Sequence, residues 1–253
     1  MGMLKGRTAI VVGASSGVGY GCALRYAEEG ANVLACSNEE EGLLQLAEEA
    51  AGLEGKIVTL VADVSKEEDL NNIVEKTISE FGRIEILACI AQGGLSHPTD
   101  LIHATSEYAL ESYTTGPLYT MLLMQKCFPY MKEQQYGRII TTSSGGAVSG
   151  TPGFASYAMA KGAIMSLTRV AAKEWAQYGI TTNCFFPVIK ARGFDMTPQG
   201  KAAMEELTRI IPVRYVGEAY RDCSPILAFM ASEQAHYMNG QMIGIDGGLT
   251  LLA

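Results

Sequence analysis

Short apolar segments rich in β-branched residues alternate along the chain with longer stretches in which apolar residues recur every three or four positions. The short segments predict β-strands, and several are continuous apolar runs, as expected for strands buried on both faces. We expect strands over 7–12, 32–36, 56–61, 84–89, 138–142, 181–186 and 242–245. The longer stretches predict helices over 17–29, 39–51, 67–81, 156–178 and 218–231, with a further long helix that ends near Lys132. This alternation predicts an α/β fold in which a parallel sheet carries helices on both faces.

Residues that are typical of helix ends support these boundaries. Gly30, Gly82 and Gly179 come directly after helical stretches, where a residue in the left-handed conformation commonly ends a helix. Asp63 and Ser65 precede an acidic first turn, so we expect one of them to cap the third helix.

The whole chain, 1–253, reads as one domain, because no linker, repeat or low-complexity tract divides it. At 48% hydrophobic residues, it can bury a large core without disulfides or metal ions. The least regular segment is 188–212, which we expect to be a loop that covers a site at the strand ends.

The net charge of −8 argues against nucleic acid or an anionic membrane surface as a partner. No apolar stretch reaches the length of a bilayer, and the N-terminus enters the first strand directly, so we expect a cytoplasmic protein. The six cysteines form no C-x-x-C pair, and the three histidines are scattered. We therefore expect buried, reduced cysteines and no metal site.

A glycine-rich loop follows the first strand and leads into an apolar helix. It reads Gly13-Ala14-Ser15-Ser16-Gly17-Val18-Gly19. Glycines allow a tight turn and a close approach of the backbone to a pyrophosphate, whose charge would lie at the helix N-terminus. A tight strand-to-helix turn also needs glycine, but this loop lies in the first βαβ unit and favours dinucleotide binding.

Tyr157 and Lys161 stand four residues apart, which places them on one face of the predicted helix, and Ser144 precedes them across a Gly-rich turn. An ammonium near a phenol favours the phenolate, so Tyr157 can act as an acid or base. The Ser144 hydroxyl can stabilise charge on a carbonyl oxygen. Tyr-x-x-x-Lys alone occurs by chance in many helices, so the context decides.

That context resembles the short-chain dehydrogenase/reductase family over essentially the whole chain. The glycine loop, Asp63-Val64 after the third strand, the Ser144, Tyr157 and Lys161 set and Asp246-Gly247-Gly248 occur in the family's order. The resemblance implies a doubly wound, seven-stranded Rossmann fold and an NAD(P)(H) cofactor. It also implies hydride transfer between the cofactor and a small-molecule secondary alcohol or ketone.

The resemblance also assigns roles. Tyr157 would be the acid/base, Lys161 would lower its pKa and bind the nicotinamide ribose, and Ser144 would hold the substrate oxygen. Asp63 and Val64 would bracket the adenine, although Asp63 also reads as a helix cap. Further cofactor contacts are expected from Ala91, Pro187 and Val188.

Several positions depart from the family pattern. Cys89 and Ile90 stand where the family has two asparagines, and Gln92 replaces a glycine. Tyr113 replaces the helical asparagine that holds a water for proton relay, and Val188 replaces a glycine beside the nicotinamide. These changes raise an alternative: a catalytically inactive structural subunit of a hetero-oligomeric dehydrogenase. The retained serine, tyrosine and lysine argue for an enzyme.

The end of the second strand carries neither usual cofactor signature. NAD selection in the family rests on an aspartate there and NADP selection on an arginine, but this chain has Ser37 and Asn38. Three glutamates follow, and no cationic side chain nearby in the sequence could pair with the 2′-phosphate of NADP, so we favour NAD. Asn38 with these glutamates also reads simply as a capped helix start.

The expected substrate lining is mostly apolar and includes Val148, Phe154, Phe194 and Met196. Such a pocket suits a hydrophobic cyclic, aromatic or acyl substrate. The long helix and the helix of Tyr157 carry apolar residues on more than one face, which predicts a homodimer or homotetramer. A hetero-oligomer with a related subunit is the alternative.

Overall fold

A single parallel sheet of seven strands forms the centre of the molecule, in the order β3-β2-β1-β4-β5-β6-β7. This computed structural model describes residues 2–93, 98–190 and 198–250. The strands are β1 Thr8–Val12, β2 Asn32–Ser37, β3 Ile57–Val61, β4 Ile86–Cys89, β5 Gly137–Thr142, β6 Ile180–Pro187 and β7 Met242–Ile245. All six pairings are parallel, so the predicted α/β fold and the seven predicted strands are confirmed.

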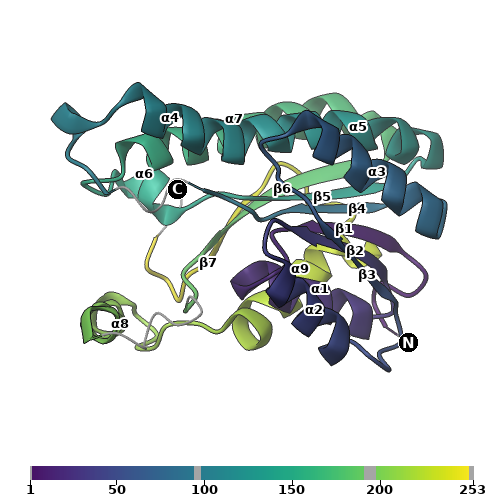
Figure 1. The fold of residues 1–253 in the computed structure, drawn as a ribbon, viewed down its shortest axis with the longest axis horizontal. Helices are drawn as coiled ribbons and strands as arrows, with labels where there is room; N and C mark the ends of the chain where they lie inside the picture. The colour runs from purple at the N-terminus through teal and green to yellow at the C-terminus, as the bar shows by residue number, and fades with distance from the viewer. Residues whose placement is uncertain (1, 94–97, 191–197, 251–253) are drawn as a thin grey trace.

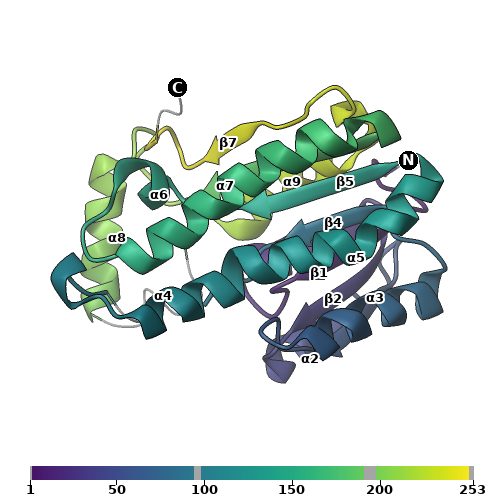
Figure 2. The same ribbon diagram turned by 90° about the horizontal axis from the view of Figure 1, so that it is seen from above.

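Helices cover both faces of the sheet (Figure 1). One layer contains α1, α2 and α9, and the other contains α3, α5 and α7. Their bounds, with those of the remaining helices, are α1 Gly17–Glu28, α2 Glu40–Glu49, α3 Glu67–Phe81, α4 Ser106–Tyr113, α5 Tyr119–Gln134, α6 Gly145–Ser149, α7 Ala155–Trp175, α8 Pro198–Ile210 and α9 Ser224–Ala231. Seen from above, α4 and α5 follow one another as a long rod beside α7 (Figure 2).

Alternate residues of each strand enter two different cores. On β1, Ala9 and Val11 pack with the layer of α1, α2 and α9, whereas Ile10 and Val12 pack with that of α3, α5 and α7. Both faces of the strand are therefore buried away from solvent, which explains why the strand sequences are continuous apolar runs.

One prediction about an element was wrong. The segment 188–212 was expected to be a loop, but it contains the 13-residue helix α8. This helix lies apart from the two layers (Figure 1). It begins at Pro198, whose fixed φ suits the first helical position, and then runs through good helix formers. The long helix predicted to end near Lys132 ends at Gln134 and is interrupted by a π-helical turn, Thr114–Leu118.

The helix ends divide into predictions that were confirmed and others that were wrong. Gly30, Gly82 and Gly179 all have positive φ, as expected. The cap expected from Asp63 or Ser65 is absent, because Lys66 is the N-cap residue of α3 and makes no side-chain cap bond. Asp63 instead accepts hydrogen bonds from the backbone N–H and the hydroxyl of Ser65, at 3.0 and 2.7 Å. The start of α2 likewise has Glu39, not Asn38, at the N-cap.

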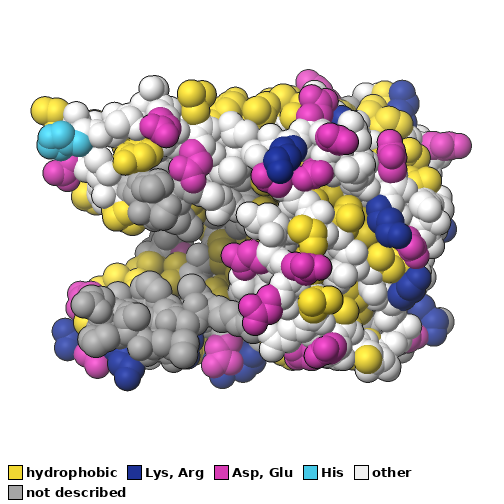
Figure 3. Space-filling view, viewed as in Figure 1, with side chains coloured by type: hydrophobic (Ala, Val, Ile, Leu, Met, Phe, Trp, Pro, Cys, Tyr) yellow, Lys and Arg dark blue, Asp and Glu magenta, His cyan; other side chains and the backbone are white. Residues whose placement is uncertain are grey.

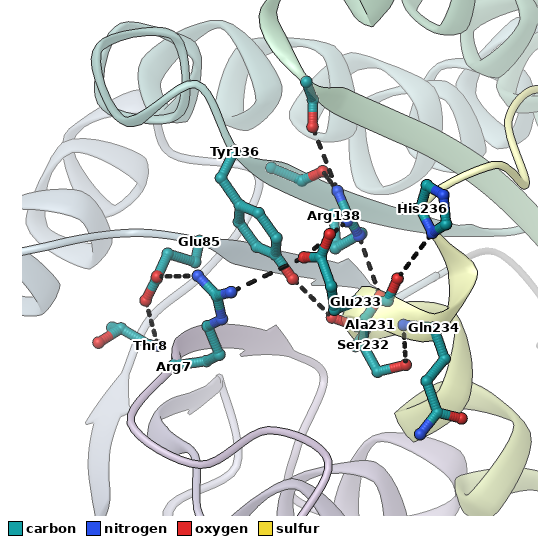
Figure 4. Close-up of polar contacts among 12 residues, drawn as sticks. Arg7, Thr8, Glu85, Tyr136, Arg138, Ala231, Ser232, Glu233, Gln234 and His236 are labelled. Carbon is teal, nitrogen blue, oxygen red and sulfur yellow. Dashed lines mark hydrogen bonds and ion pairs between the residues drawn. The ribbon is translucent and has the colours of Figure 1, made fainter.

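A network of charged side chains joins the edge of the sheet where the strands begin (Figure 4). The buried Glu85 carboxylate, just before β4, pairs with Arg7 and Arg83, both at 2.7 Å, and accepts the backbone N–H of Thr8 at 2.9 Å. Nearby, Arg138 donates to the backbone carbonyl of Ser232 at 3.1 Å. The network therefore connects segments far apart in the sequence, at the edge opposite the strand ends described below.

Candidate active site

The strand order reverses between β1 and β4, so the loops that follow these two strands leave toward opposite faces of the sheet. Two cavities, of about 270 and 350 Å³, lie at this point. Both are lined by Gly13, Ser37, Asn38, Glu39, Ala91 and Gln92. Figure 3 shows the molecule hollowed on the same side, between the part with α4 and α6 and the part with α8.

The glycine loop has the geometry that a pyrophosphate requires. Gly13 has φ +88°, and a Cβ there would lie 2.8 Å from the backbone nitrogen of Ala91. Helix α1 begins at Gly17, and its N-cap residue Ser16 makes no side-chain cap bond. The N–H groups of the first turn are therefore not occupied by that serine hydroxyl and can face an anion.

The smaller cavity contains the residues expected around an adenine. Asp63 and Val64 line it together with Val12 and Ala62, at the ends of β1 and β3. Hydrogen bonds from the Ser65 hydroxyl and backbone N–H lower the pKa of Asp63, so its carboxylate is ionised at neutral pH.

The larger cavity brings together most of the other expected site residues. Those lining it are Gly13, Ser15, Ser16, Val18, Gly19, Ser144, Tyr157, Lys161 and Pro187. The Phe154 ring meets the Tyr157 ring edge to face, with centroids 6.5 Å apart. Val188 lines a different cavity, beside Ile189 and β7, and Val148 is 44% exposed on α6. Phe194 and Met196 lie outside the described residues.

Different elements position the serine, tyrosine and lysine. Ser144 caps α6, and its Oγ accepts the backbone N–H of Gly146 at 3.2 Å. Tyr157 lies in the first turn of α7 and Lys161 one turn later. Lys161 is only 1% exposed, and its Nζ donates to the Thr142 carbonyl at 2.8 Å. The same Nζ lies 5.6 Å from the centre of the Tyr157 ring.

Burial dominates the protonation of this pair. It raises the pKa of Tyr157, although a hydrogen bond with Ser144 acts in the opposite direction. It also lowers the pKa of Lys161 from 10.5 to about 8. The net lowering of the phenol pKa expected from Lys161 is therefore not seen in this structure, because loss of water destabilises the phenolate more than its neighbours stabilise it. Tyr157 holds its proton at neutral pH.

The structure adds residues that the sequence did not assign to the site, among them Glu39, Gln92 and Thr142. Glu39 and Gln92 line both cavities, and Thr142 supplies the carbonyl that binds Lys161. The sequence signals for Glu39 were its place after Asn38 and its negative charge, which favoured NAD. Gln92 stood out only as a departure from the family pattern, and nothing in the sequence distinguished Thr142.

Comparisons with known proteins agree with this geometry. A family model described as Enoyl-(Acyl carrier protein) reductase matches residues 13–250. The chain is 32% identical over 253 residues to 3-oxoacyl-(acyl-carrier-protein) reductase FabG of Thermotoga maritima, covering 98% of this chain and 99% of that protein. The chain belongs to the short-chain dehydrogenase/reductase family.

Other members of the family are similarly close. A 12alpha-hydroxysteroid dehydrogenase of a Clostridium species is 34% identical over 257 residues, covering 98% of each chain. The crystal structure of levodione reductase superposes with a TM-score of 0.88 at 29% identity, covering 97% of this chain and 98% of that one. This short-chain dehydrogenase/reductase is thus an NAD(P)-dependent oxidoreductase, and its glycine loop and two adjoining cavities fit that cofactor.

The helices and the candidate metal ligands within residues 2–93, 98–190 and 198–250 bear on other functions. None of the helices there has the length and apolar character needed to cross a membrane. No group of three or more histidine, cysteine or acidic side chains in that part of the chain is arranged to hold a metal ion. All six cysteines are buried thiols.

Proposed function

We propose that this protein interconverts a hydrophobic secondary alcohol and its ketone, with Tyr157 as the acid/base. The observation that carries the proposal is that Ser144, Tyr157 and Lys161 line the same cavity as the glycine loop. The presence of the serine, tyrosine and lysine in one cavity favours an enzyme over the alternative of a catalytically inactive subunit.

Each side chain has a distinct task in this mechanism. The cofactor, when held by the glycine loop, would supply or accept the hydride that the carbonyl carbon gains or loses. Tyr157 donates its proton to the carbonyl oxygen during reduction and takes it back during oxidation, and Ser144 donates a hydrogen bond to the same oxygen. Lys161 gives one of its three N–H donors to Thr142, and its positive charge stabilises the phenolate that Tyr157 becomes.

The substrate class follows from the surroundings of Tyr157. The Phe154 ring packs beside it, and the apolar side chain of Val148 is exposed on the neighbouring helix α6. Two relatives are named for a 3-oxoacyl group and a hydroxysteroid, both of which place a carbonyl or alcohol in a largely apolar molecule. We infer a cyclic, aromatic or acyl substrate, bound beside Phe154.

The proposed cofactor preference is for NAD, and Glu39 supplies the reason. Its carboxylate lines both cavities and accepts a hydrogen bond from Ser15 Oγ at 3.3 Å, while Ser15 Oγ and Ser37 Oγ lie 2.8 Å apart. A carboxylate held at the end of β2 can accept hydrogen bonds from ribose hydroxyls and would repel a 2′-phosphate.

We also propose a cytoplasmic homodimer or homotetramer. Apolar side chains such as Leu110 on α4 and Met159 and Val170 on α7 are exposed on the surface of the chain. Two neighbouring helices with exposed apolar residues are typical of a contact between subunits.

Cofactor titration and one substitution test the proposal. NADH and NADPH fluorescence titrations should show binding, with NADH the tighter of the two. Tyr157→Phe should lower kcat for the reduction of cyclic, aromatic and acyl ketones by roughly 10³-fold or more. It should leave the Kd for NADH nearly unchanged. Tyr178→Phe, in the 3-10 turn beyond α7, is the matched control and should retain turnover.

Either of two results would refute it. Absence of binding of both cofactors at millimolar concentration would exclude the enzyme, and undiminished turnover by Tyr157→Phe would exclude the assigned acid/base. Tighter binding of NADPH than of NADH would overturn the cofactor preference alone.

A further inference from the structure

The helix beside the candidate active site contains a break in its hydrogen-bonding pattern. α4 and α5 are joined by the five-residue π-helical turn Thr114–Leu118, which packs against α7, the helix of Tyr157 and Lys161. Tyr113, which replaces the asparagine of the family, is 49% exposed at the start of this turn. Pro117 within the turn removes one backbone N–H, and the inner side of the turn remains open to a side chain of another element.

Gln92 supplies such a side chain. Its Nε2 donates to the backbone carbonyls of Ser112, at 2.9 Å, and Gly93, at 3.0 Å. Backbone carbonyls near a π-turn lose part of the regular helical pattern and need other donors. The Gln92 amide thus donates hydrogen bonds both to the last turn of α4 and to the loop that follows β4.

Shape complementarity supports the same contact. The Oε1 atom of Gln92 is buried without a hydrogen-bond partner within the described part of the chain, and it lies against the α-carbon of Gly116. A Cβ at Gly116 would overlap the amide. The glycine in the π-turn therefore leaves the space that the glutamine fills.

A second bond ties the same loop to the same turn. The backbone N–H of Gly93 donates to Thr115 Oγ1 at 3.1 Å, and that hydroxyl donates to the carbonyl of Glu111 at 2.7 Å. Gln92 also lines both cofactor cavities. Its contacts therefore connect the loop after β4 and the π-turn with the cofactor site.

We propose that Gln92 is a positioning residue: its amide fixes the π-turn against α7 and so holds Tyr157 and Lys161 in place. Part of this inference rests on the proposed function, because turnover is one of its measurements. The residue acts through the helices and does not touch the reacting atoms.

Two variants at Gln92 separate hydrogen bonding from packing. Gln92→Met keeps the volume but removes the donor, and Gln92→Glu keeps the shape but turns an acceptor toward two carbonyls. We expect both to lower kcat by about 10-fold or more, and in Gln92→Met, which adds no charge to the cofactor cavities, the Kd for NADH should change by less than about threefold. Gln177→Met, which removes one exposed glutamine bond to the carbonyl of Glu174, is the matched control and should change neither quantity.

Hydrogen exchange gives a measurement that needs no turnover. In Gln92→Met, the amides of the π-turn and of the first two turns of α7 should exchange faster, with α3 unchanged.

The outcomes distinguish the two proposals. If the unmodified protein reduces ketones and Gln92→Met matches it in kcat and in hydrogen exchange, the positioning role is wrong and the proposed function stands. If the unmodified protein binds NADH but reduces none of the ketones, the proposed function is in doubt, and exchange at the π-turn still decides the role of Gln92.

Discussion

At the scale of single residues, burial sets the chemistry of the site more than sequence spacing does. The spacing of Tyr157 and Lys161 predicts that they share a helix face, and α7 places them one turn apart. It does not predict that Lys161 is buried against the Thr142 carbonyl, which lies 19 positions earlier in the chain. The lowered pKa of Lys161 is a consequence of that tertiary contact.

This burial makes the stability of the protein depend on pH. The pKa of Lys161 is about 8 in the folded chain, against an ordinary value of 10.5, so the unfolded chain binds more protons between these two values. The free energy of unfolding should therefore rise with pH in this window, by about 3 kcal/mol relative to Lys161→Met, which has no proton to release. Urea unfolding of both proteins at pH 7 and pH 10.5 measures the difference.

The control for this experiment is Lys173→Met, in the last turn of the same helix. Lys173 is exposed, so its substitution should leave the pH dependence of the unmodified protein unchanged. A difference between the unmodified protein and Lys161→Met that is the same at both pH values would show that the lysine is not buried as described.

At the scale of elements, two glycines with open space around them have opposite roles. Gly82 ends α3 with φ +73°, whereas Gly162 lies inside α7 with ordinary helical geometry, and a Cβ added at either would meet no neighbouring atom within 4 Å. Gly82→Ala should lower the free energy of unfolding by about 1 kcal/mol, because alanine is strained at positive φ. Gly162→Ala should raise it by about 0.5 to 1 kcal/mol.

Thermal and urea unfolding of the two alanine variants tests the pair together. Since no neighbouring atom is displaced in either variant, the difference between them reports backbone conformation alone. Equal effects of the same sign would contradict this account of the two positions.

The elements also differ in how well sequence patterns predict them. Strands were predictable because both faces of each are buried, so their apolar runs are continuous. The helix α8 has a clear helical alternation of apolar and polar residues in its sequence, so the expected loop was a misreading of that segment and not a limit of sequence patterns. The π-turn at 114–118 contains Pro117, which lacks a backbone N–H and locally disturbs the helical hydrogen bonds, whereas its neighbour Gln92 lies more than 20 positions away and could not be placed from the sequence.

At the scale of the whole molecule, opposite edges of the sheet serve different purposes. The candidate site occupies the edge where the strands end, and the charged network of Glu85 occupies the edge where they begin (Figure 4). Glu85→Gln should lower the free energy of unfolding by about 2 kcal/mol, because it weakens two ion pairs at a buried carboxylate. Turnover per folded molecule should be unchanged, since the site lies at the other edge.

Urea unfolding and the ketone assay measure the two quantities. Glu54→Gln is the control, because the ion pair of Glu54 with Lys5 is exposed to solvent and its loss should have little effect on stability. A fall in kcat with unchanged stability in Glu85→Gln would show that the two edges are not independent. Acidic side chains are also widespread on the face in Figure 3, in agreement with the net charge of −8.

The sequence by itself determined the α/β fold, the strand positions and the identity of the glycine loop and the Ser144, Tyr157 and Lys161 set. It could do so because each depends on local periodicity or on a motif of fixed spacing. Only the tertiary structure decided that Glu39 and Gln92 line the cofactor cavities, that burial governs the Lys161 ammonium, and that a π-turn adjoins it. The cavity lining and the burial arise from contacts between segments distant in the chain, which no local pattern encodes, whereas the π-turn also has a local contribution from Pro117.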